Sequence, residues 1–310
     1  MPLDRDVAEM LEIMAALGAP ALSEGTVEEA RRNYDAAPKP IGDVLAVVED
    51  HTVPGPAGPI PVRLYADADA DADADDRPIV VFFHGGGWVL SSVEGHDPTA
   101  RRIAARSGAV VVSVDYRLAP EGPFPAPHDD CWAVTAWLAE HGAEWGGDPS
   151  RIAVCGDSAG GNLAAGVAIR ARDEDLSLAL QALIYPCIDD HQHGYPSMAE
   201  NGTGYFLTAA DMVWFWDHFV PPEHRSDPRA VPARLEQMSG LAPAFVQTAE
   251  FDPLRDEGEE YARRLAASGV QTELVRYPGV VHGFVTRWHA IARAGRAHDD
   301  LAAALRTAFS

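Results

Sequence analysis

The sequence predicts an α/β fold with a mostly parallel central sheet and helices on both faces. Short continuous apolar segments alternate with longer segments of helical periodicity over most of the 310 residues. Such apolar runs are typical of strands buried on both faces, and their alternation with helices is typical of a parallel sheet. Apolar residues make up 47% of the chain, which is enough for a large core.

Each element follows from its own pattern. The predicted buried strands are residues 79–83, 109–114, 152–155, 178–184, 245–246 and 274–275. Helical patterns follow at 97–106, 129–141, 159–172, 255–268 and 287–308. Ahead of the first buried strand we expect helices over 5–17 and 26–34 and extended segments near 44–52 and 60–65.

Two regions depart from this alternation. Residues 66–76 are an Ala-Asp repeat that has no apolar side chain large enough to build a core, so we expect a solvated hairpin loop. Residues 190–240 contain no buried strand and are rich in Pro, Gly, His and Trp. We interpret the second region as an insertion into the α/β fold.

The net charge of the chain restricts the classes of molecule that it could bind. The net charge is −23, from 47 acidic and 24 basic residues, and such a field repels nucleic acid and anionic membranes. No stretch reaches the ~18 uninterrupted apolar residues that a membrane span needs. The N-terminal segment does not resemble a signal peptide. We therefore expect no nucleic acid partner, no membrane insertion and a cytoplasmic location.

Cofactor and metal signals are weak. The only lysine, Lys39, lies far from any glycine-rich turn, which disfavours a phosphate loop. His191 and His193 could bind a metal, but no third ligand stands at a suitable spacing, so a solvated loop is the better account. The three cysteines form no C-x-x-C pair and are interpreted as core residues. The prediction is an enzyme without cofactor or metal.

The motif G-x-S-x-G at residues 156–160 marks Ser158 as the candidate nucleophile. It directly follows the predicted strand 152–155 and precedes an Ala-rich helical segment. A serine on a tight strand-to-helix turn sits in strained backbone, so its close neighbours must lack side chains. The motif alone is weak evidence, and its position between strand and helix makes it specific.

The sequence His-Gly-Gly-Gly-Trp at 84–88 follows the predicted strand 79–83. Consecutive glycines leave backbone N–H groups free to bind the oxyanion of an acyl-transfer reaction, and one such donor is worth ~3 kcal/mol. We expect this oxyanion hole to use Gly85, Gly86 and Gly87 together with the N–H of Ala159.

The candidate base is His282. In proteins with this type of nucleophile turn, the acid and the histidine follow the serine along the chain, so His84 is expected to be structural. His282 follows the last predicted strand and precedes Gly283, which permits a sharp turn. The other histidines after Ser158 fall in the insertion or in the last helical pattern: His191, His193, His218, His224, His289 and His298.

The candidate acid is Asp252, at the start of the loop after strand 245–246, with Glu250 as second choice. Its role would be to orient the imidazole and stabilise the imidazolium, so its position matters more than its basicity. Asp256 is better explained as the start of the following helix, where a negative charge is favourable.

Five motifs stand in a characteristic order: H-G-G-G-W at 84–88, D-Y-R-L-A-P-E at 115–121, G-D-S-A-G-G-N at 156–162, D-P-L-R-D at 252–256 and H-G-F at 282–284. With them the chain resembles the hormone-sensitive-lipase-like branch of the α/β-hydrolases, the bacterial carboxylesterases. The resemblance implies a catalytic triad of Ser158, Asp252 and His282. It also implies a helical cap of residues 1–45 and 190–240 over a catalytic domain of 46–189 and 241–310, in which 115–121 is scaffolding.

The resulting hypothesis is hydrolysis of small-molecule esters with short-to-medium acyl chains, through an acyl-enzyme. An amidase, a deacetylase or a lactonase could use the same three groups. In that case the aromatic residues at 205–206 and 214–216 could be pocket walls, although helically spaced aromatics are usually core. A non-catalytic receptor is a further alternative, disfavoured because serine, acid and histidine are all present. A homo-oligomer is possible.

Overall fold

A computed structural model describes residues 2–18, 21–67 and 77–310 of the chain. Within these residues, eight strands form one sheet in the order β1-β2-β4-β3-β5-β6-β7-β8. The strand pairs from β4 to β8 are parallel, whereas β1–β2 and β2–β4 are antiparallel. The expected mostly parallel sheet is confirmed.

Every predicted strand and helix overlaps an observed one. The strands are β1 (Val47–Gly55), β2 (Gly58–Ala66), β3 (Arg77–Phe83), β4 (Val110–Val114), β5 (Gly147–Asp157), β6 (Leu180–Ile184), β7 (Ala244–Phe251) and β8 (Thr272–Val281). The helices are α1 (Arg5–Leu17), α2 (Val27–Ala36), α3 (Val93–Ser107), α4 (Ala126–His141), α5 (Ala159–Asp173), α6 (Pro196–Asn201), α7 (Ala209–Phe219), α8 (Arg255–Ala267) and α9 (Ala292–Ala308).

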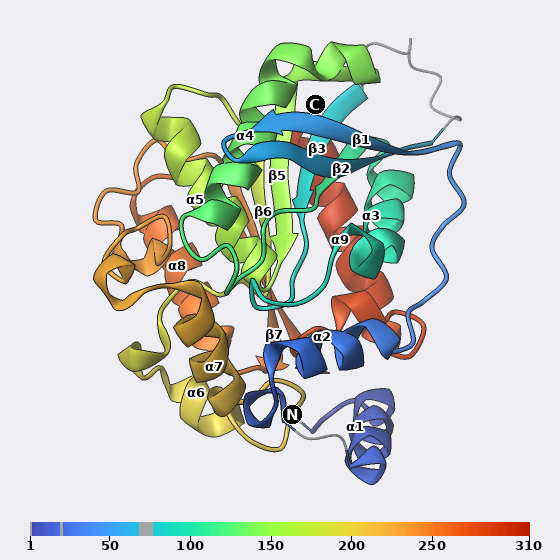
Figure 1. Cartoon of the computed structure of the whole chain (residues 1–310), viewed down its shortest axis with the longest axis vertical. Coiled ribbons are helices and arrows are strands. Elements are labelled where there is room, and N and C mark those ends of the chain that lie inside the picture. Colours follow the sequence, from blue (N-terminus) through green and yellow to red (C-terminus); the bar gives the residue numbers. More distant parts are fainter. Residues whose placement is uncertain (1, 19–20, 68–76) are drawn as a thin grey trace.

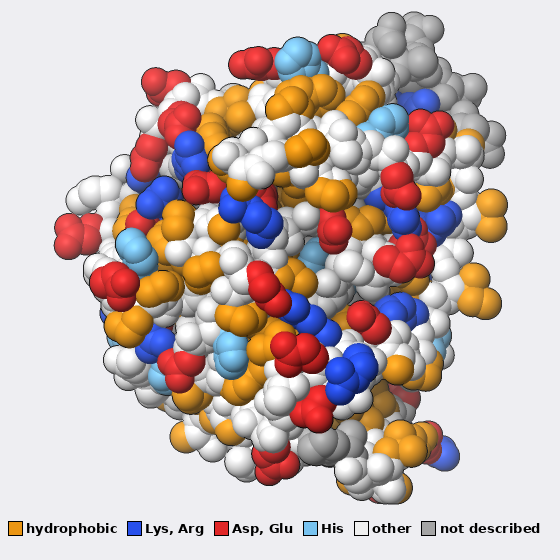
Figure 2. Space-filling model, viewed as in Figure 1, with side chains coloured by type: hydrophobic (Ala, Val, Ile, Leu, Met, Phe, Trp, Pro, Cys, Tyr) orange, Lys and Arg blue, Asp and Glu red, His pale blue; other side chains and the backbone are white. Residues whose placement is uncertain are grey.

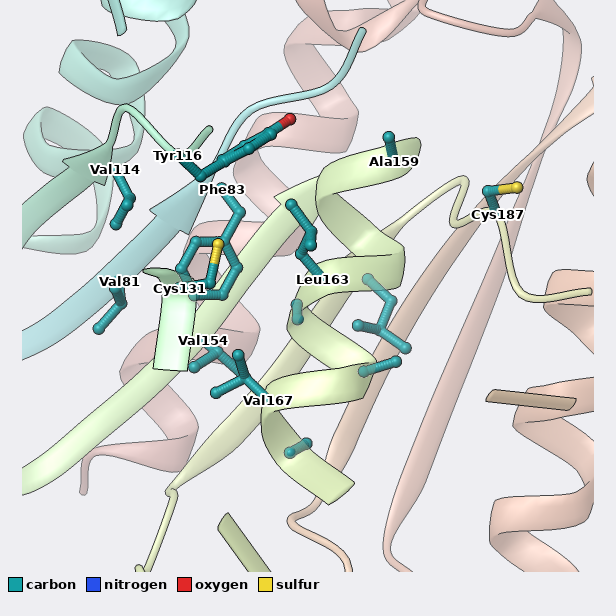
Figure 3. Packing of buried hydrophobic residues seen from close by; sticks show 14 of the residues in the cluster. Val81, Phe83, Val114, Tyr116, Cys131, Val154, Ala159, Leu163, Val167 and Cys187 are labelled. Atoms are coloured by element: carbon teal, nitrogen blue, oxygen red, sulfur yellow. The ribbon is translucent and has the colours of Figure 1, made fainter. Parts of the chain in front are cut away.

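The sheet is covered on both faces, because successive side chains of a strand point to opposite sides. Val80 and Phe82 of β3 pack with α3 and α9 in one apolar cluster. Val81 and Phe83 pack with α4 and α5 in a second cluster. Figure 3 shows this second cluster, in which side chains of β3 and β5 lie against Leu163 and neighbouring residues of α5. Figure 1 shows α3 and α9 on one side of the sheet and α4, α5 and α8 on the other.

The predicted hairpin was assigned to the wrong connection. Residues 66–76 lead from β2 to β3, and β4 lies between these two strands in the sheet, so the connection is not a hairpin. The hairpin joins β1 and β2, whose register closes at Gly55 opposite Gly58. Residues 68–76 themselves lie outside the described residues. The error arose because the Ala-Asp repeat is a conspicuous turn signal, whereas strand order is a tertiary property.

Two helix boundaries differ from the prediction. Helix α3 begins at Val93, four residues before the predicted start, because the Ser92 side chain accepts a hydrogen bond from the Gly95 N–H and caps the helix. Helix α9 begins at Ala292, and the residues before it include a short 3₁₀ turn, Val285–Arg287. Helix boundaries are the least predictable property of a periodic pattern.

Helices α1, α2, α6 and α7 lie together beyond one end of the sheet, at the bottom of Figure 1. The N-terminal segment contacts the insertion through the Ser23 N–H, which donates to Asp211 Oδ1 at 3.2 Å. Two side chains of α2, Val27 and Ala30, are buried in the apolar cluster that also contains residues of α7. Segments far apart in the sequence therefore meet at this end of the sheet.

Acidic and basic side chains are interspersed on the face shown in Figure 2. Arg63 illustrates the arrangement, because its guanidinium binds Asp50 at 2.6 Å and Glu94 at 2.8 Å. Exposed pairs of this kind are each worth at most about 1 kcal/mol. Among the helices that the structure describes, none is both long and apolar enough to cross a membrane.

Candidate active site

Ser158 stands at the junction between β5 and α5. Its backbone has φ 57° and ψ −118°, a region that residues with a side chain seldom adopt. The Ser158 N–H donates to the carbonyl of Ile184 at 2.8 Å, and the Ser158 carbonyl accepts from the Cys187 N–H at 3.2 Å. The strained turn is thus held by hydrogen bonds to β6 and to the segment that follows β6.

The neighbouring glycines are required by close backbone contacts. A Cβ atom on Gly160 would overlap the carbonyl oxygen of Phe83 in β3. A Cβ on Gly156 would overlap the carbonyl of Gly160. A Cβ on Gly161 would lie 2.8 Å from the Cβ of Pro186. The motif therefore fits this turn for a steric reason, as the sequence predicted.

The imidazole of His282 lies between Ser158 and Asp252. Its Nε2 is 2.9 Å from Ser158 Oγ, and its Nδ1 is 2.7 Å from Asp252 Oδ2. His282 is 5% exposed, and the Tyr185 ring packs against it with 4.7 Å between ring centroids. The structure brings the three predicted residues into one hydrogen-bonded chain.

Asp252 is fully buried, and its carboxylate has two partners. Besides His282, it accepts a hydrogen bond from the Leu254 N–H at 2.8 Å through Oδ1. The backbone carbonyl of Asp252 accepts from Asn201 Nδ2 at 3.2 Å, which ties the loop to α6. A carboxylate held from both oxygens is oriented toward the imidazole.

The two alternative acids have other partners. Glu250 Oε2 accepts from the Gly279 N–H at 2.8 Å. Asp256 lies in the first turn of α8, where it accepts from the Ser197 N–H at 2.8 Å and pairs with Arg255. Among the described hydrogen bonds, His282 Nδ1 is bound to Asp252, which favours Asp252 as the acid.

The N–H groups of the glycine-rich loop differ in their hydrogen-bond partners. The Gly85 N–H donates to Asp157 Oδ1 at 2.9 Å, so it is directed at that carboxylate. Within the described residues, the N–H groups of Gly86, Gly87 and Ala159 make no hydrogen bond. Gly86 and Gly87 have φ values of 120° and 59°, which favour glycine. The expectation that Gly85 contributes to the oxyanion hole does not fit its hydrogen bond and is not retained.

His84 is fully buried and is not in contact with Ser158 among the hydrogen bonds of the described residues. Its Nδ1 binds the carbonyl of Gly85 at 2.8 Å, and its ring stacks on Tyr116 with 4.3 Å between centroids. The Tyr116 hydroxyl donates to the His84 carbonyl at 2.7 Å. Burial, together with the nearby His96, lowers the pKa of His84 to about 3, so the ring is neutral. These contacts agree with the structural role that was expected.

Asp157 connects the nucleophile turn with both ends of the glycine-rich loop. It accepts from the Gly85 N–H at the start of the loop, and its Oδ1 is 3.3 Å from His96 Nε2. His96 Nδ1 is in turn 2.8 Å from Ser91 Oγ at the end of the loop. Burial raises the pKa of Asp157, but the His96 imidazole and the Gly85 N–H outweigh it and hold that pKa below its ordinary value.

Sequence reasoning did not identify this connection. Asp157 was visible as the second residue of the G-x-S-x-G motif, but nothing local indicated its partners. His96 lies 61 residues earlier in the chain, on α3. Ser91 has φ 75°, which the sequence does not reveal either.

The aromatic residues of the insertion divide into two groups. Trp216 is fully buried and packs on Trp88, so it belongs to the core. Phe215 and Phe206 reach the site, because a Cβ on Gly87 would overlap the Phe215 ring and a Cβ on Gly283 would lie 3.4 Å from the Phe206 ring. Phe215 is also buried in the core cluster that contains Trp216, so the core interpretation applies to both, and the interpretation as pocket walls stays a prediction.

The metal candidates and the cysteine thiols are not members of the hydrogen-bonded chain from Ser158 to Asp252. In the described part of the chain, no three His, Cys, Asp or Glu side chains come together as a metal site. His193 is half-exposed, with Nδ1 at 3.4 Å from Asp189. The cysteines, Cys131, Cys155 and Cys187, are free and buried, and burial raises the pKa of each thiol.

A separate cavity of about 760 Å³ lies between the β1–β2 hairpin and helices α3 and α4. Its lining includes His51, Trp137, Trp145 and Asp115, and it contains none of the residues that surround Ser158. Its carboxylates and aromatic rings include no activated nucleophile. The cavity therefore does not compete with Ser158 as the place where chemistry occurs.

Known proteins resemble the chain in sequence and in fold. A family model described as the α/β hydrolase fold matches residues 80–286. The carboxylesterase NlhH of Mycobacterium tuberculosis is 46% identical over 255 residues, covering 81% of this chain and 79% of that protein. An arylesterase of Saccharolobus solfataricus is 35% identical and covers 92% and 93% of the two chains. The structure of a hyperthermophilic esterase from Pyrobaculum calidifontis superposes with a TM-score of 0.92 at 41% identity, and each chain is covered completely.

Proposed function

The chain belongs to the hormone-sensitive-lipase-like family of α/β hydrolases and is a carboxylic ester hydrolase, and on that premise we propose that Ser158, His282 and Asp252 are its catalytic triad. The observation that carries the proposal is the position of His282, hydrogen-bonded to the serine through one nitrogen and to the aspartate through the other. The same arrangement performs acyl transfer in unrelated folds.

In the first half of the reaction, His282 Nε2 takes the proton of the Ser158 hydroxyl while Oγ attacks the ester carbonyl. The carbonyl π electrons move to oxygen and form a tetrahedral oxyanion. When that intermediate collapses, the bond to the alcohol oxygen breaks, and His282 returns its proton to the leaving alcohol. Asp252 accepts from Nδ1–H throughout, so it maintains the tautomer and stabilises the imidazolium.

In the second half, water replaces the alcohol. His282 removes a proton from water as the water oxygen attacks the acyl-enzyme carbonyl. A second oxyanion forms and collapses, the Ser158 ester bond breaks, and Oγ recovers a proton from His282. The carboxylic acid leaves, and no oxidant, metal or other co-reactant is consumed.

The proposed oxyanion hole consists of the N–H groups of Gly86, Gly87 and Ala159. The absence of hydrogen-bond partners for these groups within the described residues supports this assignment. Ala159 is also the first residue of α5, so the positive end of the helix dipole adds to the stabilisation.

Asp157 and His96 act as positioning residues for this hole. Asp157 binds the first glycine of the loop directly, and through His96 it binds Ser91 at the other end. His96 Nε2 lies 3.3 Å from Asp157 Oδ1, and His96 Nδ1 lies 2.8 Å from Ser91 Oγ. Fixing both ends of the loop would keep the intervening N–H groups aimed at the oxyanion, which lowers the cost of reorganisation.

Residues 1–45 and 190–240 form a helical cap in this proposal, and 46–189 and 241–310 form the catalytic domain. The contact of Ser23 with Asp211 supports the pairing of the two cap segments. Phe206 and Phe215, both from the insertion, approach glycines beside the triad and the oxyanion hole, which supports a site narrowed by aromatic rings. Such narrowing favours esters with short-to-medium acyl chains.

The decisive experiment measures hydrolysis of p-nitrophenyl acetate, butyrate and longer esters by wild type and by Ser158→Ala and His282→Ala. Each substitution should lower kcat on the order of 10⁴-fold or more, because the triad acts as a unit. His193→Ala is the matched control, since this half-exposed histidine lies outside the site. A fluorophosphonate should label wild type and fail to label Ser158→Ala. Wild-type activity in Ser158→Ala would refute the mechanism.

A further inference from the structure

Arg287 lies at the edge of the proposed active site, five residues after His282. Its Nη1 donates to the carbonyl of Gly283 at 2.7 Å. Its guanidinium carbon is 4.1 Å from the centroid of the Phe206 ring, which belongs to the insertion. A Cβ on Gly283 would lie 2.6 Å from Nη1 and 3.4 Å from the Phe206 ring. The guanidinium is therefore placed between the loop that carries His282 and the aromatic ring above it.

No carboxylate neutralises this guanidinium by direct contact. Within the residues that the structure describes, Arg287 forms no ion pair, and its polar contacts are the Gly283 carbonyl and the Thr286 hydroxyl. The chain has about two acidic residues for each basic one, so an unpaired, partly buried arginine stands out. Asp157 is close enough to raise the pKa of Arg287, but its oxygens are bound to Gly85 and His96.

Burial lowers the pKa of Arg287, but an arginine keeps its charge at neutral pH. Removing a charge from water without a partner is unfavourable. A partly buried cation that has spare N–H donors therefore offers binding energy to an anion that reaches it. The planar guanidinium is suited to two parallel hydrogen bonds with a carboxylate.

Two tyrosines lie within electrostatic range of Arg287. Tyr185 packs against His282, and its hydroxyl is buried without a hydrogen-bond partner among the described residues. Tyr34 belongs to α2, and burial and the charge of Asp157 raise its pKa to about 12. The charge of Arg287 opposes the upward shift of both tyrosine pKa values. At neutral pH both phenols are protonated and able to donate.

We propose that Arg287 binds a carboxylate carried by the substrate, so that the preferred esters are half-esters of dicarboxylic acids or O-acylated hydroxy acids, both of which keep a free carboxylate. The inference rests on the proposed function, because it places this anion subsite beside the triad. Arg287 is a specificity-determining residue in this proposal and takes no part in bond breaking. Its contribution should therefore be seen in binding.

The net charge of the molecule opposes the binding of anionic esters, so a preference for them would have a local cause. With a net charge of −23, the overall field repels anionic substrates. A preference for an anionic ester must then come from a local cation. Added salt screens the general repulsion, so it should increase the rate with anionic esters at low substrate concentration.

The test compares two pairs of substrates that match in length and differ in charge. Monomethyl glutarate carries the carboxylate on the acyl side, and methyl pentanoate is its neutral match. 3-Acetoxypropionate carries it on the alcohol side, and propyl acetate is its neutral match. Hydrolysis is followed by pH-stat with wild type, Arg287→Gln and Arg287→Lys. For each pair, the measured quantity is kcat/KM of the anionic ester divided by kcat/KM of the neutral ester. In the pair whose carboxylate reaches Arg287, Arg287→Gln should lower this ratio by about tenfold or more. The loss should come from a higher KM for the anionic ester. Arg287→Lys should restore part of the loss.

Arg264→Gln is the matched control, because Arg264 also binds backbone carbonyls, those of Ala233 and Leu235, away from the site. An unchanged ratio in Arg287→Gln for both pairs would overturn the subsite, while loss of all activity in Ser158→Ala would still uphold the triad. If Arg287→Gln does not fold, inhibition of wild type by glutarate and by glutaramide replaces it. Glutarate should inhibit methyl pentanoate hydrolysis at least about tenfold more strongly, and equal inhibition would overturn the subsite.

Discussion

Asp157 connects the turn at Ser158 with the glycine-rich loop and with α3. It precedes Ser158, the proposed nucleophile, so the tight turn that holds Ser158 also directs the Asp157 carboxylate toward the glycine-rich loop. There it meets the Gly85 N–H at 2.9 Å and His96 at 3.3 Å. Asp157 is 4% exposed, so these contacts act with little screening by water. The residue beside the nucleophile therefore influences the groups that would bind the oxyanion.

Replacing Asp157 by asparagine should impair catalysis more than binding. The amide keeps an acceptor for one partner and presents an NH₂ group to the other, so one end of the loop is released. Removing one oxyanion donor costs ~3 kcal/mol, and misplacing it costs less. We therefore expect kcat to fall roughly 10- to 100-fold, with KM changed by less than about threefold. Steady-state kinetics with p-nitrophenyl butyrate measure both constants.

Two checks separate positioning from general destabilisation. Burst titration with a fluorophosphonate gives the fraction of active protein, which corrects kcat for unfolded material. Asp217→Asn is the control carboxylate, since Asp217 is exposed and pairs only with Arg225 in the described residues. A kcat for Asp157→Asn equal to wild type after this correction would contradict the positioning role.

At the scale of elements, α2 is attached to the loop that continues from Gly86 and Gly87. Arg31 of α2 donates to the carbonyl of Val89 at 2.9 Å and to that of Ala119 at 3.0 Å, and it binds Glu121 through two nitrogens. Glu121 is the last residue of the motif at 115–121, which was predicted to be scaffolding. Through this contact, the motif at 115–121 holds the N-terminal helix α2 against the glycine-rich loop.

Arg31→Ala should loosen α2. Glu121 is largely exposed, so the ion pair itself contributes little, and the two hydrogen bonds to backbone carbonyls account for most of an expected loss of about 1–2 kcal/mol. Thermal unfolding and limited trypsin digestion should show a lower Tm and faster cleavage near residues 21–45. Arg32→Ala is the control on the same helix, because Arg32 is exposed. Equal behaviour of the two variants would mean that Arg31 does not anchor the helix.

At the scale of the whole molecule, buried histidines link stability to pH. His84, His128 and His298 are buried, and burial is the largest cause that lowers the pKa of each to about 3. In the unfolded chain each has a pKa near 6.5. Between these values the unfolded state binds more protons than the folded state, so stability rises with pH and is lost as the pH falls below about 6.5.

The free energy of unfolding should therefore decrease from pH 7 toward pH 5. Each histidine contributes up to about 1.4 kcal/mol per pH unit, so the three together contribute up to about 4 kcal/mol per pH unit. Urea unfolding at several pH values measures this slope. His298→Gln should remove about a third of it, and His193→Gln, at a half-exposed position, should leave it unchanged. A flat dependence over this range would contradict the prediction.

Local patterns predicted much of the fold and of the proposed site. The strand, the glycines and the helix around Ser158 are consecutive in the chain, so their mutual constraints can be read from the sequence. His282 and Asp252 were selected because each follows a predicted strand of a parallel sheet, and the ends of such strands share one edge. Strand order was not predicted, and the hairpin was misassigned, since pairing between strands depends on the whole sheet.

The sequence by itself determined that this is an α/β hydrolase and indicated which serine, histidine and aspartate to test. The reason is that strained turns, buried strands and glycine runs impose local steric demands that few residues satisfy. Only the tertiary structure decided that Gly85 binds Asp157 and that His96 joins Asp157 to Ser91. It also decided that Arg287 lies against the Phe206 ring and has no ion pair among the described residues. Those contacts join segments distant in the chain, and their geometry depends on how the completed sheet and helices pack.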